Sequence, residues 1–344
     1  MTFSRNLRFV CRIVSVLAFV SLLGPRIAFA AEDAPARCQG ADMLTEMQSK
    51  APDIYKQVMA ESDALPNTQA MLWKIEKTGV PSSYLFGTMH LSDPRVATLS
   101  PTVKADIAQS KSVALEVADL SDTAVAAAMA KMASLIVYTN GESLKKALTD
   151  QEYKDVQQTV AKAGMPGELA ATMKPWLVSM LLATSDCERK QLAAGKTVLD
   201  LQVAAEAQKH GIAITGLETI EDQLSALASV PNDQQIAMLK VGLKYLDRAD
   251  DMTETLVQMY VKRQIGAAMP FQLALAAQSG ISPSVFDGFK KSLLVDRNAR
   301  MRDAALPLLD KGDAFIAVGA LHLPGPTGLV ALLRQSGYTV TPVE

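Results

Sequence analysis

The chain has 344 residues, of which 49% are hydrophobic and 20% are charged, with 19 glycines and 16 prolines. This composition excludes a collagen-like, low-complexity or largely disordered chain. The length is ample for a sizeable core without the help of disulfide bonds. The formal net charge is −2, whereas a nucleic-acid-binding protein more often carries a basic excess, so we expect no nucleic-acid partner.

The first 30 residues have the pattern of a secretory signal peptide. Three arginines precede an apolar stretch at 13–23, and the A-F-A sequence at 28–30 is typical of a cleavage site. The alternative is an uncleaved anchor, but this apolar stretch and every later one are shorter than the about 20 residues of a membrane helix. We therefore expect a periplasmic or secreted protein, mature from residue 31, with no stable membrane span after cleavage.

Cleavage would leave two cysteines, Cys38 and Cys187. An even pair in an exported chain predicts one disulfide bond, and two unrelated buried thiols are the alternative. Two cysteines cannot build a zinc site with four thiolate ligands.

The first expected elements are an apolar-periodic entry arm and a β-hairpin. The arm lies within 31–68, and strands at 70–76 and 83–86 flank turn residues that favour a hairpin. Ser100 and Pro101 then predict the N-cap and first residue of a helix that ends near Ser110. The next strand spans 112–117.

The composition changes between residues 122 and 208, where Ala, Met, Lys, Leu and Gln dominate with helical periodicity. We expect four or five helices there, which form a helical insertion in a single domain over 31–344. Beyond it we expect strands at 211–216, 314–318 and 338–343, with helices at 219–230, 233–246, 253–266, 282–310 and 327–336. The alternation predicts an α/β fold with a mixed central β-sheet and flanking helices.

Two of the three histidines share a local pattern. His90 lies in G-T-M-H-L-S-D-P and His322 in G-A-L-H-L-P-G-P, so both read G-x-x-H-L-x-x-P after an apolar strand. A strand that ends in Gly can turn sharply, and α/β proteins place their sites on the loops beyond. Histidine is the commonest metal ligand, so both loops could converge on one ion. Two buried or capping histidines are the alternative, and His210 is expected to lie at a helix C-cap.

Two glutamates lie in comparable places. Glu116 interrupts the apolar strand S-V-A-L-E-V, and Glu218 follows the strand and turn I-T-G-L-E. A carboxylate in an apolar strand must be paired, protonated or bound to metal if it is buried, and a solvent-facing edge residue is the alternative. Arg297 and Asn298 fall in the middle of an expected helix.

Five motifs together resemble the TraB/PrgY/GumN family, which is related to the TIKI metalloproteases. They are Y-L-F-G-T-M-H, A-L-E-V, G-L-E-T-I-E-D-Q-L, R-N-A-R-M and F-I-A-V-G-A-L-H-L-P-G-P-T-G-L, and the resemblance covers about 72–343. It implies a fold similar to erythromycin-esterase-like (EreA-like) and haem-binding ChaN-like proteins.

The same resemblance implies a metal site made of His90, His322 and Glu116. It places Glu218, Arg297 and Asn298 in the same cleft, where they and Glu116 are the predicted catalytic residues, and it favours manganese or cobalt. Zinc and iron fit imidazole and carboxylate ligands about equally well on chemistry.

We therefore predict an exported metal-dependent hydrolase with a peptide or small-molecule substrate, and a peptidase is the favoured class. The alternative of the same fold is a non-catalytic protein that binds haem, a metal or a peptide. A third hypothesis is a metal-free esterase with His90 as the base. The chain has neither the H-E-x-x-H pattern of zincins nor the G-x-S-x-G elbow of serine hydrolases.

Overall fold

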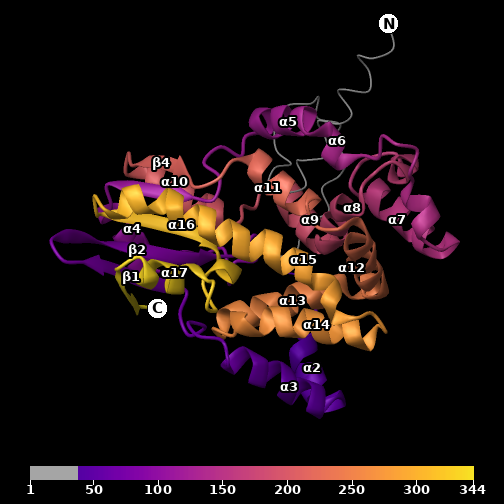
Figure 1. Ribbon diagram of the computed structural model, residues 1–344, viewed down its shortest axis with the longest axis horizontal. Coiled ribbons are helices and arrows are strands. Elements are labelled where there is room, and N and C mark those ends of the chain that lie inside the picture. Colours follow the sequence, from indigo (N-terminus) through magenta and orange to yellow (C-terminus); the bar gives the residue numbers. More distant parts are fainter. Residues whose placement is uncertain (1–37) are drawn as a thin grey trace, which may run out of the picture.

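The computed structural model describes residues 38–344, and the predicted signal peptide at 1–30 lies outside this range. Six strands form one sheet in the order β4-β3-β5-β2-β1-β6 (Figure 1). They are β1 (Leu72–Lys77), β2 (Val80–Thr88), β3 (Ser112–Leu115), β4 (Ala213–Gly216), β5 (Ala314–Gly319) and β6 (Thr339–Pro342). The predicted α/β fold with a mixed sheet is therefore confirmed, while the EreA/ChaN-like detail stays a prediction.

The first two strands form the predicted hairpin. They pair antiparallel from Leu72 opposite Phe86 to Lys77 opposite Val80. Gly79 lies in the turn with a φ of 78°, a left-handed conformation that favours glycine.

The four other pairings decide where a site can form. β4, β3, β5 and β2 are parallel neighbours, whereas β6 adds to β1 antiparallel. Thr88 pairs with Gly319, and Leu115 pairs with Ala317, so the carboxyl ends of these strands lie along one edge. Open α/β sheets bind their ligands outside this edge.

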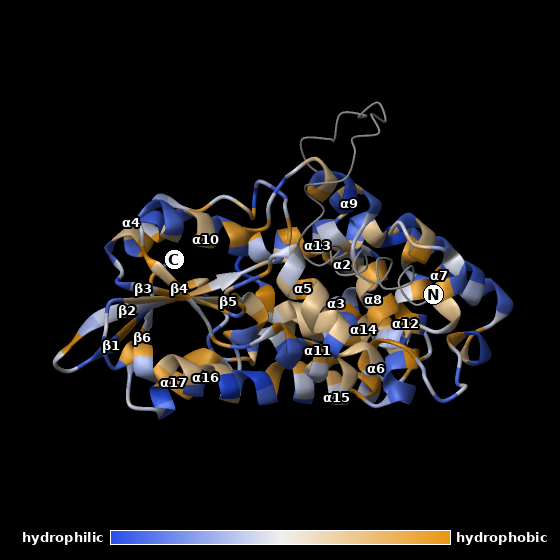
Figure 2. Ribbon diagram, turned by 90° about the horizontal axis from the view of Figure 1, so that it is seen from above, coloured by the Kyte–Doolittle hydropathy of each residue, from blue (hydrophilic) through white to orange (hydrophobic). Residues whose placement is uncertain are grey.

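Helices cover both faces of the sheet, as the edge-on view in Figure 2 shows. One face packs against α4 (Pro101–Gln109) and α10 (Leu199–Lys209), and the other against α16 (Asp296–Leu309) and α17 (Leu329–Gln335). Alternate residues of β5 serve the two cores, because Phe315 joins the first and Ile316 the second.

A second, helical part of the molecule lies beside the sheet (Figures 1 and 2). Its own core includes Trp176, Leu144 and Leu239. The helices outside the sheet layers are α2 (Met43–Lys50), α3 (Pro52–Asp63), α5 (Asp122–Lys131), α6 (Ala133–Ile136), α7 (Asp150–Lys162), α8 (Pro175–Ala183), α9 (Asp186–Ala193), α11 (Ile220–Ala228), α12 (Asn232–Lys244), α13 (Ala249–Val261), α14 (Ala268–Gln278) and α15 (Asp287–Phe289).

Short 3₁₀-helical and π-helical turns link these elements. The 3₁₀ turns span Leu144–Ala147, Gly167–Ala171, Leu246–Arg248, Ile265–Ala267, Pro283–Phe286 and Ala320–His322, and a π-helical turn spans Lys290–Val295.

The helical part is not made of residues 122–208 alone. α12 packs against α8 although it lies beyond residue 208, whereas α10 lies within that range and covers the sheet. The bounds of the predicted insertion therefore do not coincide with one spatial layer, and the single-domain assignment stays a prediction.

The predicted disulfide bond is confirmed, since Cys38 is bonded to Cys187 at the start of α9. Within residues 38–344, no helix is long and apolar enough to cross a membrane.

Candidate metal site at the carboxyl ends of the parallel strands

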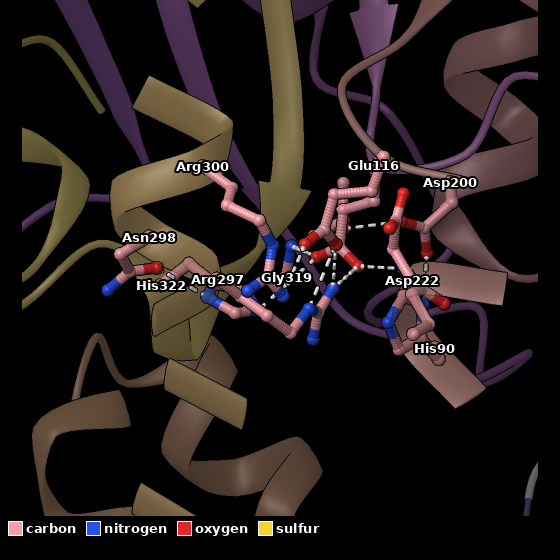
Figure 3. A network of polar contacts seen from close by, with 12 residues as sticks. His90, Glu116, Asp200, Asp222, Arg297, Asn298, Arg300, Gly319 and His322 are labelled. Atoms are coloured by element: carbon pink, nitrogen blue, oxygen red, sulfur yellow. Dashed lines mark hydrogen bonds and ion pairs between the residues drawn. The ribbon is translucent and has the colours of Figure 1, made fainter. Parts of the chain in front are cut away.

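Each of the four parallel strands delivers one predicted site residue just beyond its carboxyl end. His90 follows β2, Glu116 follows β3, Glu218 follows β4 and His322 follows β5. Glu116 was expected inside its strand, but the strand ends at Leu115, so Glu116 is the first residue past the ladder. Figure 3 shows His90 and His322 on either side of Glu116.

Gly319 marks the point where the two histidine loops meet. A Cβ at this position would lie 3.2 Å from Glu116 Oε1, 3.5 Å from His322 Cδ2 and 3.8 Å from His90 Nε2. The three side chains therefore surround one small space, which any residue larger than glycine would enter. The convergence expected from the paired motifs is present.

Gly87, the first residue of the G-x-x-H motif that contains His90, has a packing role. A Cβ at Gly87 would lie 2.6 Å from Leu323 Cδ1 and 3.1 Å from the Cα of Ala320. Glycine at 87 thus allows the loop after β5 to pack directly on β2.

Asn298 fixes the orientation of His322. Its Nδ2 donates to the carbonyl of Thr327 at 2.8 Å, so its Oδ1 faces Nδ1 of His322 at 2.6 Å and accepts the ring proton there. The Nε2 atom of His322 is then left with its lone pair, 3.6 Å from Glu116 Oε1. Burial lowers the pKa of His322 to about 4, which keeps the ring neutral at pH 7.

Asp200, at the start of α10, fixes the orientation of His90. Its Oδ2 lies 2.8 Å from Nδ1 of His90, and its Oδ1 accepts from the hydroxyl of Thr88 at 2.6 Å. The attraction of the Asp200 carboxylate raises the pKa of His90 to about 9. The His90 side chain is 60% exposed, so it reaches the solvent side of the site while His322 is buried.

Glu116 is held in its charged form. Oε1 accepts from the backbone N–H of Gly319 at 2.7 Å, and Oε2 accepts from Gln223 at 2.9 Å and from Arg297 Nη2 at 2.7 Å. Burial alone would raise the pKa of the Glu116 carboxyl, but His322 and Arg297 outweigh it and lower this pKa to about 2.

Arg297 bridges the two glutamates. Its Nη2 contacts Glu116, and its Nε donates to Glu218 Oε2 at 2.9 Å. Glu218 Oε1 is buried without a hydrogen-bond partner and lies 3.6 Å from Arg300 Nη2. Glu218 thus anchors Arg297 and does not face the histidines.

The donor set fits a divalent ion in its chemistry. His90 and His322 each have Nδ1 anchored and Nε2 without a protein hydrogen-bond partner, which is the arrangement found around metal-ligating histidines, and Glu116 supplies an ionised carboxylate. Because the pKa of His90 is raised to about 9, its ring would have to release a proton when it binds an ion. Within residues 38–344, no group of three or more His, Cys, Asp or Glu side chains lies in an arrangement that could hold a metal ion, so the fit is one of ligand chemistry. Both Glu116 oxygens have protein partners, so a bound ion would share them.

A cavity of about 500 Å³ opens beside these residues. His90, Glu116 and Asp200 line one part of it, together with Gln223 of α11. This volume is in the range of about 300–1,000 Å³ that small-molecule sites occupy.

Sequence reasoning did not single out Asp200, Gln223 or Thr88 as site residues. Asp200 is a buried acid between apolar residues in V-L-D-L, which is the one signal that could have identified it. The third histidine, His210, is the C-cap of α10 as expected and contacts Glu206 at 3.1 Å, away from the site.

The chain belongs to the TraB/PrgY/gumN family, whose pattern matches residues 71–342. It is similar to the protein named metalloprotease TIKI2 of Danio rerio, with 26% identity over 323 residues that cover 79% of this chain and 60% of that protein. A metalloprotease TIKI homolog of Nematostella vectensis is 23% identical, covering 83% of this chain and 69% of its own.

Another relative is the uncharacterized protein YbaP of Shigella flexneri. It is 24% identical over 254 residues, which cover 73% of this chain and 88% of YbaP. No solved structure matches the chain.

Proposed function

We propose that the chain is an exported metal-dependent hydrolase that cleaves peptides. One observation carries the proposal: two histidines from separate strand ends are oriented through Nδ1 and surround the same space as an ionised glutamate. Relatives of the chain are named metalloproteases, which supports hydrolysis of a peptide bond.

In this proposal His90, His322 and Glu116 hold the ion. A divalent ion supplies an activated water and polarises the substrate carbonyl. Asp200 and Asn298 position the imidazoles, Arg297 keeps Glu116 ionised, and Glu218 holds Arg297. Three of the residues first predicted as catalytic, Glu218, Arg297 and Asn298, thereby become positioning residues.

Manganese or cobalt is the proposed ion, on the family resemblance, and zinc or iron would suit the same ligands. We further propose a periplasmic or secreted location. The Cys38–Cys187 bond supports it, because disulfide bonds persist in oxidising compartments.

Metal content and peptide hydrolysis of the purified mature protein test the proposal. We expect one ion per chain after loading with Mn²⁺ or Co²⁺, and cleavage of an unstructured peptide mixture. His90→Ala and His322→Ala should each abolish both, and His210→Ala should change neither, because His210 lies outside the site.

The other outcomes point to the alternatives. Metal without hydrolysis would identify a protein that binds haem, metal or peptide. Hydrolysis without any metal would favour the esterase mechanism with His90 as base.

A further inference from the structure

We propose that the preferred peptides carry a large apolar side chain beside the cleaved bond, and that the cavity next to Glu116 holds this side chain. This inference rests on the proposed function and names its substrate class. The cavity joins the site directly, since His90 and Glu116 belong to its wall.

The far wall of the cavity is apolar. It is formed by side chains from the segment after β3 and from α5, α8, α10 and α11, among them Leu120, Val125, Met180, Ala204, Leu224 and Leu227. No lysine or arginine is among the residues that line it. A side chain that enters this part would exchange water for apolar contacts at roughly 25 cal/mol per Å² buried.

The carboxylates at the cavity do not favour a basic side chain instead. Glu116 is paired with Arg297, and Asp200 is engaged by His90 and Thr88. Asp119 is exposed and accepts from the backbone N–H of Ser121. The rest of the wall is mostly apolar, with Ser121, Gln208 and Gln223 as its other polar residues.

Met180 and Leu227 close one end of this cavity. Both line this cavity and also a second, apolar cavity of about 390 Å³ among the helices. They form the partition between the two spaces, so shortening one of them would lengthen the pocket.

Wild-type protein with bound Mn²⁺ gives the first test. In a peptide series that differs at one residue, with Gly, Ala, Leu, Phe or Lys beside the cleaved bond, we expect kcat/KM for Leu or Phe to exceed that for Ala by about tenfold or more. Lys should be no better than Ala.

Two substitutions should shift the preference in opposite directions. Ala204→Phe on α10 fills the cavity and should reverse the order, so that Ala is preferred to Phe. Met180→Ala enlarges the cavity and should raise kcat/KM for side chains bulkier than Phe, such as Trp. Ala205→Phe is the matched control, because Ala205 is exposed on the same helix and does not line the cavity.

The outcomes separate this inference from the proposed function. Equal cleavage of all peptides, or a preference for Lys, would overturn the inference and leave the peptidase standing. Failure of the metal-loaded protein to cleave any peptide would overturn both. If Ala204→Phe does not fold, the wild-type series and Met180→Ala decide the question.

Discussion

Two neighbouring side chains, Asp200 and Asn298, decide how the histidines face the shared space. Asp200 and Asn298 each bond to Nδ1, so Nε2 is the nitrogen that each ring presents. The two anchors differ in charge. Asp200 attracts a proton to the exposed His90, whereas the amide of Asn298 adds no charge and burial keeps His322 neutral.

Asp200→Asn should weaken metal binding while it keeps the size of the side chain. The amide keeps an acceptor for Nδ1 but removes the negative charge that raises the basicity of the His90 ring, and outer contacts of this kind contribute roughly 10–100-fold to metal affinity. Titration calorimetry with Mn²⁺ measures the effect.

Glu206→Gln is the control for this substitution. It removes an acid that contacts a histidine on the same helix, but the histidine is His210. An equal loss of affinity in the two variants would show that the charge of α10, and not the anchor of His90, matters.

Arg297→Met should destabilise the fold strongly. Arg297 is 7% exposed and contacts two buried carboxylates, and removal of one partner from a buried ion network costs about 3–5 kcal/mol. Urea denaturation measures the change in the free energy of unfolding.

A second substitution tests the cause of that loss. Glu218→Gln added to Arg297→Met removes one unpaired charge and should restore part of the stability. Arg300→Met, at a side chain that is 47% exposed, should cost less than about 1 kcal/mol. If Arg297→Met costs no more than Arg300→Met, the buried bridge does not stabilise the fold.

The sequence predicted the residues whose local pattern is unusual. His90 and His322 stand in a repeated motif, and Glu116 interrupts an apolar strand. Asp200 has a weaker signal, an acid between apolar residues, because an acid in the first turn of a helix is ordinary. Its contact with His90 spans 110 residues of chain, which only the folded structure brings together.

At the scale of elements, the close approach at the end of β5 depends on a residue without a side chain. Gly319→Ala would place a methyl group 3.2 Å from Glu116 Oε1 and between the two histidines. We expect the protein to fold and to lose most of its affinity for Mn²⁺, since the methyl group occupies the shared space.

Gly242→Ala is the matched control for the Gly319 substitution. Gly242 lies in α12, and its new methyl group would meet only Leu182 at 3.7 Å. This variant should be unchanged in metal binding and more stable by roughly 0.5–1 kcal/mol. Full metal binding by Gly319→Ala would show that the space at Gly319 is not where the ion sits.

Element types were more predictable than element limits. The strand-like apolar segments and the turn residues between them identified the hairpin, and Ser100 caps α4 as expected. The entry arm, expected as one apolar-periodic stretch, divides into α2 and α3 because Pro52 begins a new helix. The packing of α12 on α8 joins segments far apart in the chain, which periodicity cannot reveal.

At the scale of the whole molecule, the Cys38–Cys187 bond ties the first described residue to the helix that supports the His90 loop. Glu188, next to Cys187, accepts from the backbone N–H of Ser92 at 2.8 Å. The disulfide bond therefore lies one hydrogen bond away from the segment that carries His90, but it does not touch the site itself.

Replacement of both cysteines by serine should lower stability before it lowers activity. The bond closes a loop with a sequence separation of 149 and thereby restricts the unfolded chain. Its removal should lower the free energy of unfolding by about 2–5 kcal/mol. The folded fraction keeps the Asp200 and Asn298 anchors. Its metal affinity should therefore stay within about twofold of wild type, which is well below the 1.36 kcal/mol that a tenfold change represents. Thermal unfolding and Mn²⁺ titration of the same sample separate the two effects. A tenfold loss of affinity in fully folded protein would mean that the bond positions the His90 loop through Glu188.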